Sequence, residues 1–198
     1  MKIEYIIGIL IIWGLISCSD RDENQEPTYG KVNVALSVTL PEPENVHSLA
    51  RSYTDSEIKN VDVLVFDEDG KFMERVKVDG GELTPSGTEI SFSIRLDATS
   101  KRRVIHLVTN GRSPDGVTDR LNFNDITSGM LESAAIPALG TTAMIFGSLE
   151  DQVMPLIMWG RVELPTGINI VTKADGVKLL RVAACVQVKK GVGDATNG

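Results

Sequence analysis

A ten-residue segment near the N-terminus alternates strictly between apolar and polar side chains. Residues 31–40 read K-V-N-V-A-L-S-V-T-L, so that every second side chain is Val or Leu. Because successive side chains of a strand point to opposite faces, this pattern predicts a strand that is buried on one face only. It is the strongest periodic signal in the sequence. The buried face is predicted to hold Val32, Val34, Leu36, Val38 and Leu40.

Further segments with a two-residue period, or with short apolar runs, follow along the chain. The turn residues Asp67-Glu68-Asp69-Gly70 join the first two of them into a hairpin. The closing segment 177–190 is predicted to place Leu180, Val182, Ala184, Val186 and Val188 on one face. Strands are predicted at 59–66, 71–78, 89–96, 103–109 and 177–190, with apolar pieces at 143–147 and 156–160. Residues 161–172 are predicted to form either a strand pair or an extended edge.

Only one segment has apolar residues at helical spacing. Residues 119–135 carry this pattern, and Gly129 weakens it, so the helix is predicted to be short. Strands, one short helix and then further strands favour an all-β sandwich over alternating β-α-β units.

The N-terminus has the pattern of an export signal. Residues 5–16 form an apolar run of about a dozen residues, short of the roughly 20 that span a membrane. This predicts a signal peptide over residues 1–17. Leu15-Ile16-Ser17-Cys18 resembles the bacterial lipobox, which implies lipidation of Cys18 and lasting attachment through more than one acyl chain. The alternative is an ordinary signal with an incidental Cys.

An acidic linker, residues 18–29, follows the lipobox. It resembles the surface-export signal of Bacteroidetes lipoproteins, while a solvated linker is the alternative interpretation. If Cys18 is lipidated, Cys185 has no partner within the chain, so a disulfide framework is excluded and Cys185 is interpreted as a structural thiol.

A polar segment follows the first predicted strand. Residues 41–56 contain Pro41, Pro43 and a single Arg51, and are predicted to form a long exposed loop. Arg51 is therefore a candidate site for a trypsin-like protease. The alternative is an ordinary surface arginine.

Several function classes are excluded or unsupported. The formal net charge of −7 argues against nucleic-acid binding. His47 and His106 show no metal-ligand spacing, and the acidic turn has Lys71 and Phe72 where a calcium loop needs an oxygen ligand and Gly. Motifs for hydrolases, nucleotides and dinucleotides are missing from the sequence. We therefore expect no enzyme activity, metal or cofactor.

Four segments in order resemble the Bacteroidetes fimbrillin family of major fimbrial subunits. The resemblance covers about residues 30–190. It is carried by the strand-turn-strand around Asp69-Gly70-Lys71-Phe72, by 103–110 with the following helix, by 154–160 (M-P-L-I-M-W-G) and by 177–184 (V-K-L-L-R-V-A-A).

The resemblance implies a transthyretin-like Greek-key sandwich of about seven strands, of the kind found as the N-terminal domain of fimbrillins. It also implies an assembly mechanism. A lipidated precursor reaches the outer surface, an Arg-specific protease cuts after the first strand, and a strand of another subunit replaces it. On this chain, 31–40 would be the removable strand, Arg51 the cut site and the lipid on Cys18 the attachment to the outer membrane.

The chain departs from the family pattern at its end. Residues 191–198 are predicted to be a short flexible tail, without the usual second domain and donor segment. We therefore expect a truncated product, a terminal subunit or an anchor; an anchor would keep its lipid and leave Arg51 uncut. The expected function is a surface fimbrial subunit or anchor lipoprotein that supports adhesion. The alternative is a surface glycan-binding lipoprotein, which an aromatic content of 5% supports poorly.

Overall fold

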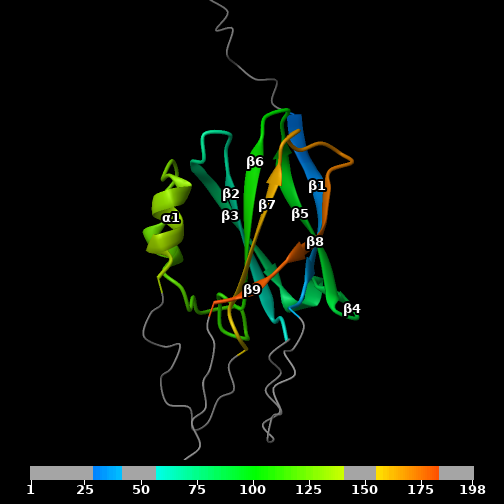
Figure 1. Cartoon of the computed structure of the whole chain (residues 1–198), viewed down its shortest axis with the longest axis vertical. Helices are drawn as coiled ribbons and strands as arrows, with labels where there is room; N and C mark the ends of the chain where they lie inside the picture. The colour runs from blue at the N-terminus through cyan, green and yellow to red at the C-terminus, as the bar shows by residue number, and fades with distance from the viewer. Residues whose placement is uncertain (1–28, 42–56, 141–154, 183–198) are drawn as a thin grey trace, which may run out of the picture.

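The structure, a computed structural model, describes residues 29–41, 57–140 and 155–182 and shows a sandwich of two sheets (Figure 1). We call the sheet with strand order β4-β5-β1-β8 the β1 sheet, and the sheet with order β3-β2-β6-β7-β9 the β6 sheet. The elements are β1 (Tyr29–Thr39), β2 (Asn60–Phe66), β3 (Phe72–Asp79), β4 (Thr84–Ser86), β5 (Glu89–Ala98), β6 (Arg103–Thr109), α1 (Glu132–Ala138), β7 (Met158–Leu164), β8 (Lys173–Lys178) and β9 (Leu180–Arg181).

The all-β sandwich with one short helix is confirmed for the described residues. Of the nine strands there, β4 has three residues and β9 has two, so seven longer strands remain. The predicted strands at 59–66, 71–78, 89–96 and 103–109 correspond to β2, β3, β5 and β6. The segment 156–160 leads into β7, and 143–147 lies outside the described residues.

The two central strands of the β6 sheet are buried on both faces. All seven residues of β2 and all seven of β6 are buried. One face packs into the core between the sheets, and the other packs against a second cluster under α1 and the loop before it. This double burial explains why these two segments read as nearly continuous apolar runs. The outer cluster includes Leu64, Phe66, Val104, Val108, Phe123, Ile126, Ala135 and Leu139.

The prediction of a helix over 119–135 is wrong in its position. Leu121, Phe123 and Ile126 are buried, but they lie in a loop whose only helical turn is the 3-10 segment Phe123–Asp125. Gly129 has φ +82°, which ends any right-handed helix there. Helix α1 begins at Glu132, after the loop has been fixed to β3 by the hydrogen bond from the Phe72 amide to the Met130 carbonyl, 2.8 Å.

The prediction for the closing segment is also wrong where the structure describes it. Leu180 and Val182 are 64% and 53% exposed, whereas Val177 and Leu179 are buried. The chain leaves the β1 sheet at the end of β8 and joins the β6 sheet as β9, so one continuous strand with one buried face does not form. Similarly, 161–172 is the end of β7 and a turn. Ala184, Cys185, Val186 and Val188 lie outside the described residues.

Candidate functional site

Strand β1 has an interior place in its sheet. It pairs antiparallel with β5, from Lys31 opposite Asp97 to Thr39 opposite Glu89. On its other side it pairs parallel with β8, which comes from the far end of the described chain. Removing β1 would separate β5 from β8 and open a gap between them, which we call the β1 slot.

The inward face of β1 agrees with the predicted alternation. Val34, Leu36 and Val38 are 0%, 1% and 0% exposed, and each belongs to the core between the sheets. Val32 and Leu40, at the two ends, are only partly buried but pack against the same core. The predicted face is therefore confirmed, with its strongest burial at the centre of the strand.

The outward face of β1 carries one buried polar residue that the sequence did not reveal. Ser37 is 3% exposed, accepts a hydrogen bond from the Gly176 amide at 2.7 Å and donates to the Glu89 carboxylate. The β8 pairing shifts between Leu36 and Val38, and Gly176, with φ +66°, lies in that bulge. Ser37 thus fixes the register of β1 against both neighbours.

The link from β1 to β2 contains the candidate protease site. Strand β1 is hydrogen bonded as far as Leu40, whose amide donates to the Thr88 carbonyl at 2.9 Å. Arg51 lies between β1 and β2 in the sequence, and Cys18 lies before β1, but both fall outside the described residues. A cut at Arg51 would leave β1 attached to the rest of the described sandwich by non-covalent contacts alone.

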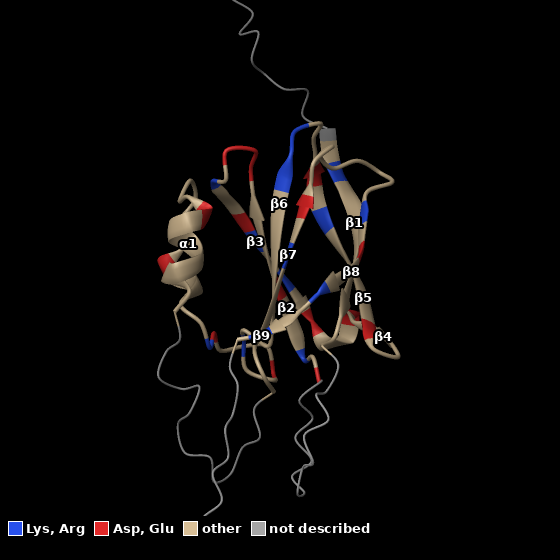
Figure 2. Ribbon diagram, in the orientation of Figure 1, with Lys and Arg blue, Asp and Glu red and all other residues tan. Residues whose placement is uncertain are grey.

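The acidic turn between β2 and β3 is paired with basic residues at the start of β6 (Figure 2). Lys101 and Arg103 each lie 3.0 Å from the Glu68 carboxylate. The hydrogen bond from Lys101 lowers the pKa of Glu68 below its ordinary value. Asp67 accepts the backbone amides of Asp69 and Lys71 at 2.9 and 2.8 Å. The carboxylates of this turn therefore stabilise the turn itself.

A buried ionic cluster fixes the opposite end of the β6 sheet. The Asp62 carboxylate is fully buried and lies 2.8 Å from Arg75 and 3.3 Å from Arg112. Burial raises the pKa of Asp62, and the two arginines only partly oppose it. Arg75 also binds Asp119 at 2.6 Å, and this contact lowers the pKa of Asp119. Arg112 binds Asp79 at 2.5 Å. These contacts tie the loop after β6 to β2 and β3.

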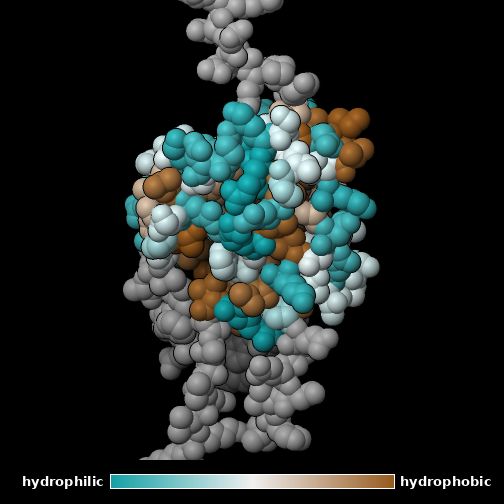
Figure 3. Space-filling view, turned by 45° about the horizontal axis from the view of Figure 1, so that its top comes forward, coloured by the Kyte–Doolittle hydropathy of each residue, from teal (hydrophilic) through white to brown (hydrophobic). Residues whose placement is uncertain are grey.

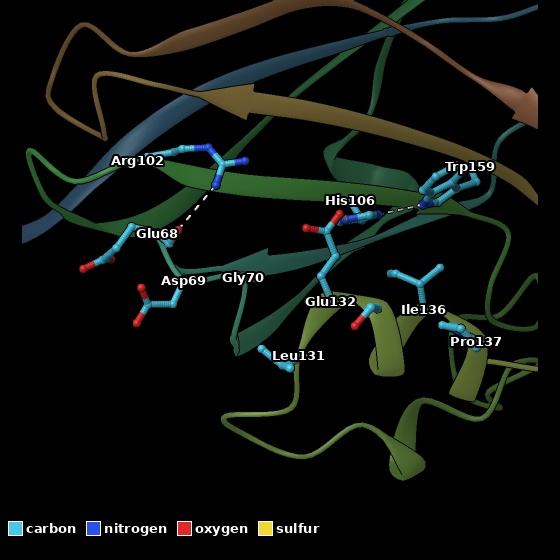
Figure 4. A pocket seen from close by; sticks show the side chains of 11 residues that line it. Glu68, Asp69, Gly70, Arg102, His106, Leu131, Glu132, Ile136, Pro137 and Trp159 are labelled. Carbon is cyan, nitrogen blue, oxygen red and sulfur yellow. Dashed lines mark hydrogen bonds and ion pairs between the residues drawn. The ribbon is translucent and has the colours of Figure 1, made fainter.

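A second polar cluster lies between α1 and the β6 sheet, beside an open cavity of about 580 Å³ (Figure 4). His106 is 1% exposed; its Nδ1 accepts from Trp159 Nε1 at 3.0 Å, and its Nε2 donates to Glu132 at 2.9 Å. Glu132 also binds Arg161 at 2.8 Å. Burial lowers the pKa of His106, and the bond to Glu132 partly offsets this. Because both ring nitrogens are engaged, His106 joins β6 to α1 rather than presenting a free base.

Sequence reasoning missed both clusters. Asp62, Arg75 and Arg112 come from two strands and a loop, and each alone resembles an ordinary solvated charge. His106 lies within the apolar segment 103–109, but its partners Glu132 and Trp159 come from α1 and β7. Among the described residues, no three metal-binding side chains gather into a possible metal site. Within the described part of the chain, no helix has the length and apolar character needed to span a membrane.

The comparisons with solved structures found fimbrial and adhesion proteins. A fimbrial assembly protein of Parabacteroides distasonis is 18% identical, covers 76% of this chain and 52% of its own, with a TM-score of 0.48. A candidate adhesin of Bacteroides thetaiotaomicron is 14% identical (79% and 47% covered, TM-score 0.46). The C-terminally truncated tip fimbrial protein Mfa3 of Porphyromonas gingivalis is 13% identical (77% and 48% covered, TM-score 0.37). The chain spans about half the length of these structures.

A comparison with curated proteins found no match. The family described as fimbrillin-A associated anchor proteins Mfa1 and Mfa2 matches residues 23–161, which is more than half of the chain. That match includes β1, the link with Arg51, the β6 sheet as far as β7, and α1. This chain therefore belongs to the fimbrillin-A associated anchor protein family, which is a family of fimbrial proteins and not of enzymes.

Proposed function

We propose that this protein is a lipid-anchored accessory subunit of a surface fimbria that joins its neighbour by strand exchange at the β1 slot. Family membership supports the fimbrial role and the association with other fimbrial subunits. The observation that carries the mechanism is the position of β1. It is an interior strand with a buried face, and its link to β2 contains Arg51, the candidate cut site.

The energetics favour replacement of β1 over its simple loss. Val34, Leu36 and Val38 are fully buried, and each contributes about 1.5–3 kcal/mol through burial. Together they contribute roughly 5–9 kcal/mol, which is comparable with the whole stability of a typical domain. A protein that has lost β1 and has nothing in the β1 slot would therefore unfold or aggregate. A strand from a second subunit would restore both the apolar contacts and the main-chain hydrogen bonds to β5 and β8.

The fate of the link decides which fimbrial role the protein takes. If an Arg-specific protease cuts at Arg51, the lipid on Cys18 delivers the precursor and leaves together with β1. If the link stays intact, the lipid on Cys18 holds the protein to the outer membrane for good. Membership of a family of anchor proteins favours the second route. In that case the β1 slot opens only when a donor strand displaces β1 from an uncut chain.

Mass spectrometry of surface material from cells that express the protein tests the proposal. A mature N-terminus at Ser52 indicates the processed route, and an acylated Cys18 in purified fimbriae indicates the anchor route. Recovery of the protein only in fractions without fimbriae, or with an unmodified N-terminus that precedes Cys18, would contradict the proposal. Replacing Arg51 with Ala should abolish the processed form without changing lipidation, and Arg95→Ala is the matched control on β5.

Glycan binding is a second candidate, favoured by one observation. Trp159, the only Trp outside the predicted signal peptide, lines the cavity of about 580 Å³ together with charged residues such as Asp69 and Arg102 (Figure 4). Pockets for small molecules commonly combine aromatic side chains with a few polar groups. Glycan-array binding that is lost in Trp159→Ala, with folding retained, would support this function. Binding that survives the substitution would exclude Trp159 from the sugar site, and absence of binding by the unmodified protein would contradict this function.

A further inference from the structure

An apolar cavity of about 410 Å³ lies at the end of the sandwich where β1 begins. Its walls come from the start of β1, the end of β5 and the loop between β7 and β8. It continues the β1 slot, because Val32 lines the cavity and also packs against the core between the sheets. In Figure 3, hydrophobic surface gathers at this end of the molecule. The residues that line the cavity include Gly30, Val32, Ala98, Ile168 and Ile170.

Gly30 lines this cavity and has no side chain to extend into it. Gly30 is an extra residue in β1, because Tyr29 pairs with Ala98 and Lys31 pairs with Asp97. A Cβ atom added at Gly30 would meet nothing within 4 Å. Gly30 does not have a positive φ, so its backbone accepts a larger residue. The strand that closes the slot in this chain therefore offers no side chain of its own there.

The walls of the cavity are held in place by backbone hydrogen bonds. The Thr99 amide donates to the Ile168 carbonyl at 2.8 Å, and the Ile168 amide donates to the Thr99 carbonyl at 2.7 Å. Gly167 makes this close approach possible, since its φ is +78° and a Cβ atom there would lie 2.1 Å from the Thr99 oxygen. The loop after β7 is thus fixed against the end of β5, and the cavity does not need to form on binding.

The rim of the cavity is exposed and apolar. Asn169 and Thr172 use their polar groups within the loop: the Asn169 amide donates to Thr172 Oγ1 at 2.8 Å, and the Val171 amide donates to Asn169 Oδ1 at 2.9 Å. The two residues at the tip, Ile170 and Val171, are 83% and 76% exposed. Of these two, Ile170 lines the cavity. A side chain that entered the cavity would cover apolar surface that β1 leaves in water.

We propose that this cavity receives a large apolar side chain of the donor strand from a second fimbrial subunit, at the position that Gly30 has in β1. This inference rests on the strand exchange proposed above. Such a donor buries more apolar surface than β1 does, so exchange is driven forward even when the other contacts are equal. Because the cavity is accessible while β1 is still in place, the donor binds there first and then displaces β1 from that end.

Two peptides test this pairing. One has the sequence of residues 30–40, and the other has the same sequence with Gly30→Leu. Each is added to the chain from Cys18 onward after cleavage at Arg51, and native mass spectrometry follows replacement of the fragment that contains β1. The Leu peptide should replace it at least about tenfold more tightly, the factor that burial of one aliphatic side chain supports. The Leu peptide should also replace the fragment that contains β1 faster than the Gly peptide does.

Protein variants locate the effect at the cavity. Ile170→Ser should remove the advantage of the Leu peptide, and Val171→Ser, a neighbour of similar exposure that does not line the cavity, should keep it. Gly30→Leu in the protein itself should slow the exchange, because the resident strand then fills its own cavity. All three variants change exposed residues, so circular dichroism should report the same fold for each.

The outcomes separate this inference from the proposed function. Exchange of both peptides with equal affinity would overturn the role of the cavity and leave strand exchange standing. Failure of both peptides to replace β1 would contradict strand exchange itself. A Leu advantage that appears only after residues 18–28 are removed would show that the chain's own upstream segment fills the cavity, which would also overturn the proposal.

Discussion

The two sheets of this sandwich are buried to different depths. In the β6 sheet, β2 and β6 are buried on both faces, because α1 and the loop before it cover the side that faces away from the core. In the β1 sheet, β5 alternates between buried and exposed residues, and the central residues of β1 are covered mainly from the core side. The β6 sheet also contains the two buried polar clusters, around Asp62 and around His106.

Under the proposed strand exchange, this difference identifies β1 as the strand that leaves. Loss of β2 or β6 would disrupt two apolar clusters and at least one buried charge network. Loss of β1 would disrupt one cluster and the contacts of Ser37, and a donor strand can restore both. We therefore propose that the β6 sheet is the permanent framework and that the β1 sheet contains the exchangeable strand.

The largest effect is expected in the framework. Arg112→Met removes one of the two cations beside the fully buried Asp62 and the hydrogen bond to the Val78 carbonyl, 2.8 Å. Leaving a buried charge poorly paired costs about 3–5 kcal/mol. Urea denaturation should show this loss in the free energy of unfolding. The exposed ion pair of Lys173 and Asp175 is the control, and Lys173→Met should change stability by less than about 1 kcal/mol. Equal effects would contradict the framework role.

The second prediction compares matched Leu residues in the two sheets. Leu36 in β1 and Leu107 in β6 are 1% and 0% exposed. In the intact chain, each Leu→Ala change should lower the free energy of unfolding by about 2–5 kcal/mol. After β1 has been replaced by a donor peptide with Leu at that position, the cost of Leu36→Ala should disappear. The cost of Leu107→Ala should remain. Thermal unfolding of the unsubstituted protein and of both variants, each before and after replacement of β1, checks this. Persistence of both costs would show that β1 had not been replaced.

A smaller effect is expected at Ser37. Ser37→Ala leaves the Gly176 amide and the Glu89 carboxylate without their partner, which costs about 1–2 kcal/mol. A donor peptide with Ala at this position should also bind less tightly, by roughly tenfold. Ser93→Ala, at an exposed position of β5, should change stability by no more than about 0.5 kcal/mol. Equal effects at Ser37 and Ser93 would rule out a register role for Ser37.

The smallest effect concerns pH and belongs to the framework. Burial lowers the pKa of His106 below its ordinary value of about 6.5, so the unfolded chain binds this proton more readily than the folded one. The stability from neutral His106 is therefore complete above about pH 6.5 and is lost as the pH falls through the lower, folded pKa. Urea midpoints at pH 7.5 and 5.5 should differ, and the difference should shrink in His106→Gln. An unchanged difference would assign the pH dependence to other groups.

The strands were predictable because their signal is local. Each pattern reflects how many faces of a strand are covered. Alternation marks strands covered on one face, as in 31–40 and 89–96, and apolar runs mark strands covered on both faces, as in 59–66 and 103–109. The inward face of β1 could therefore be predicted residue by residue. The helix could not be placed, because Leu121, Phe123 and Ile126 are buried by contact with the β6 sheet and not by helix formation.

The polar parts of the site could not be predicted, because their partners are distant in the sequence. Ser37 is buried by the bulge in β8 at Gly176, a contact that alternation within β1 cannot reveal. The cavity beside Gly30 depends on a loop that Gly167 brings against Thr99. Similarly, the exposure of Leu180 follows from the crossing between the two sheets after β8, which a two-residue period cannot show.

We propose that β1 can be exchanged while the β6 sheet stays folded. Hydrogen exchange with mass spectrometry tests it most directly on the chain cleaved at Arg51, mixed with an isotopically labelled peptide of residues 29–40. We predict that the labelled peptide replaces β1 and becomes protected, while the amides of β2 and β6 remain protected throughout. Loss of protection in β2 and β6 before or together with the replacement would contradict the account, because β1 would then be part of the same cooperative unit as the framework.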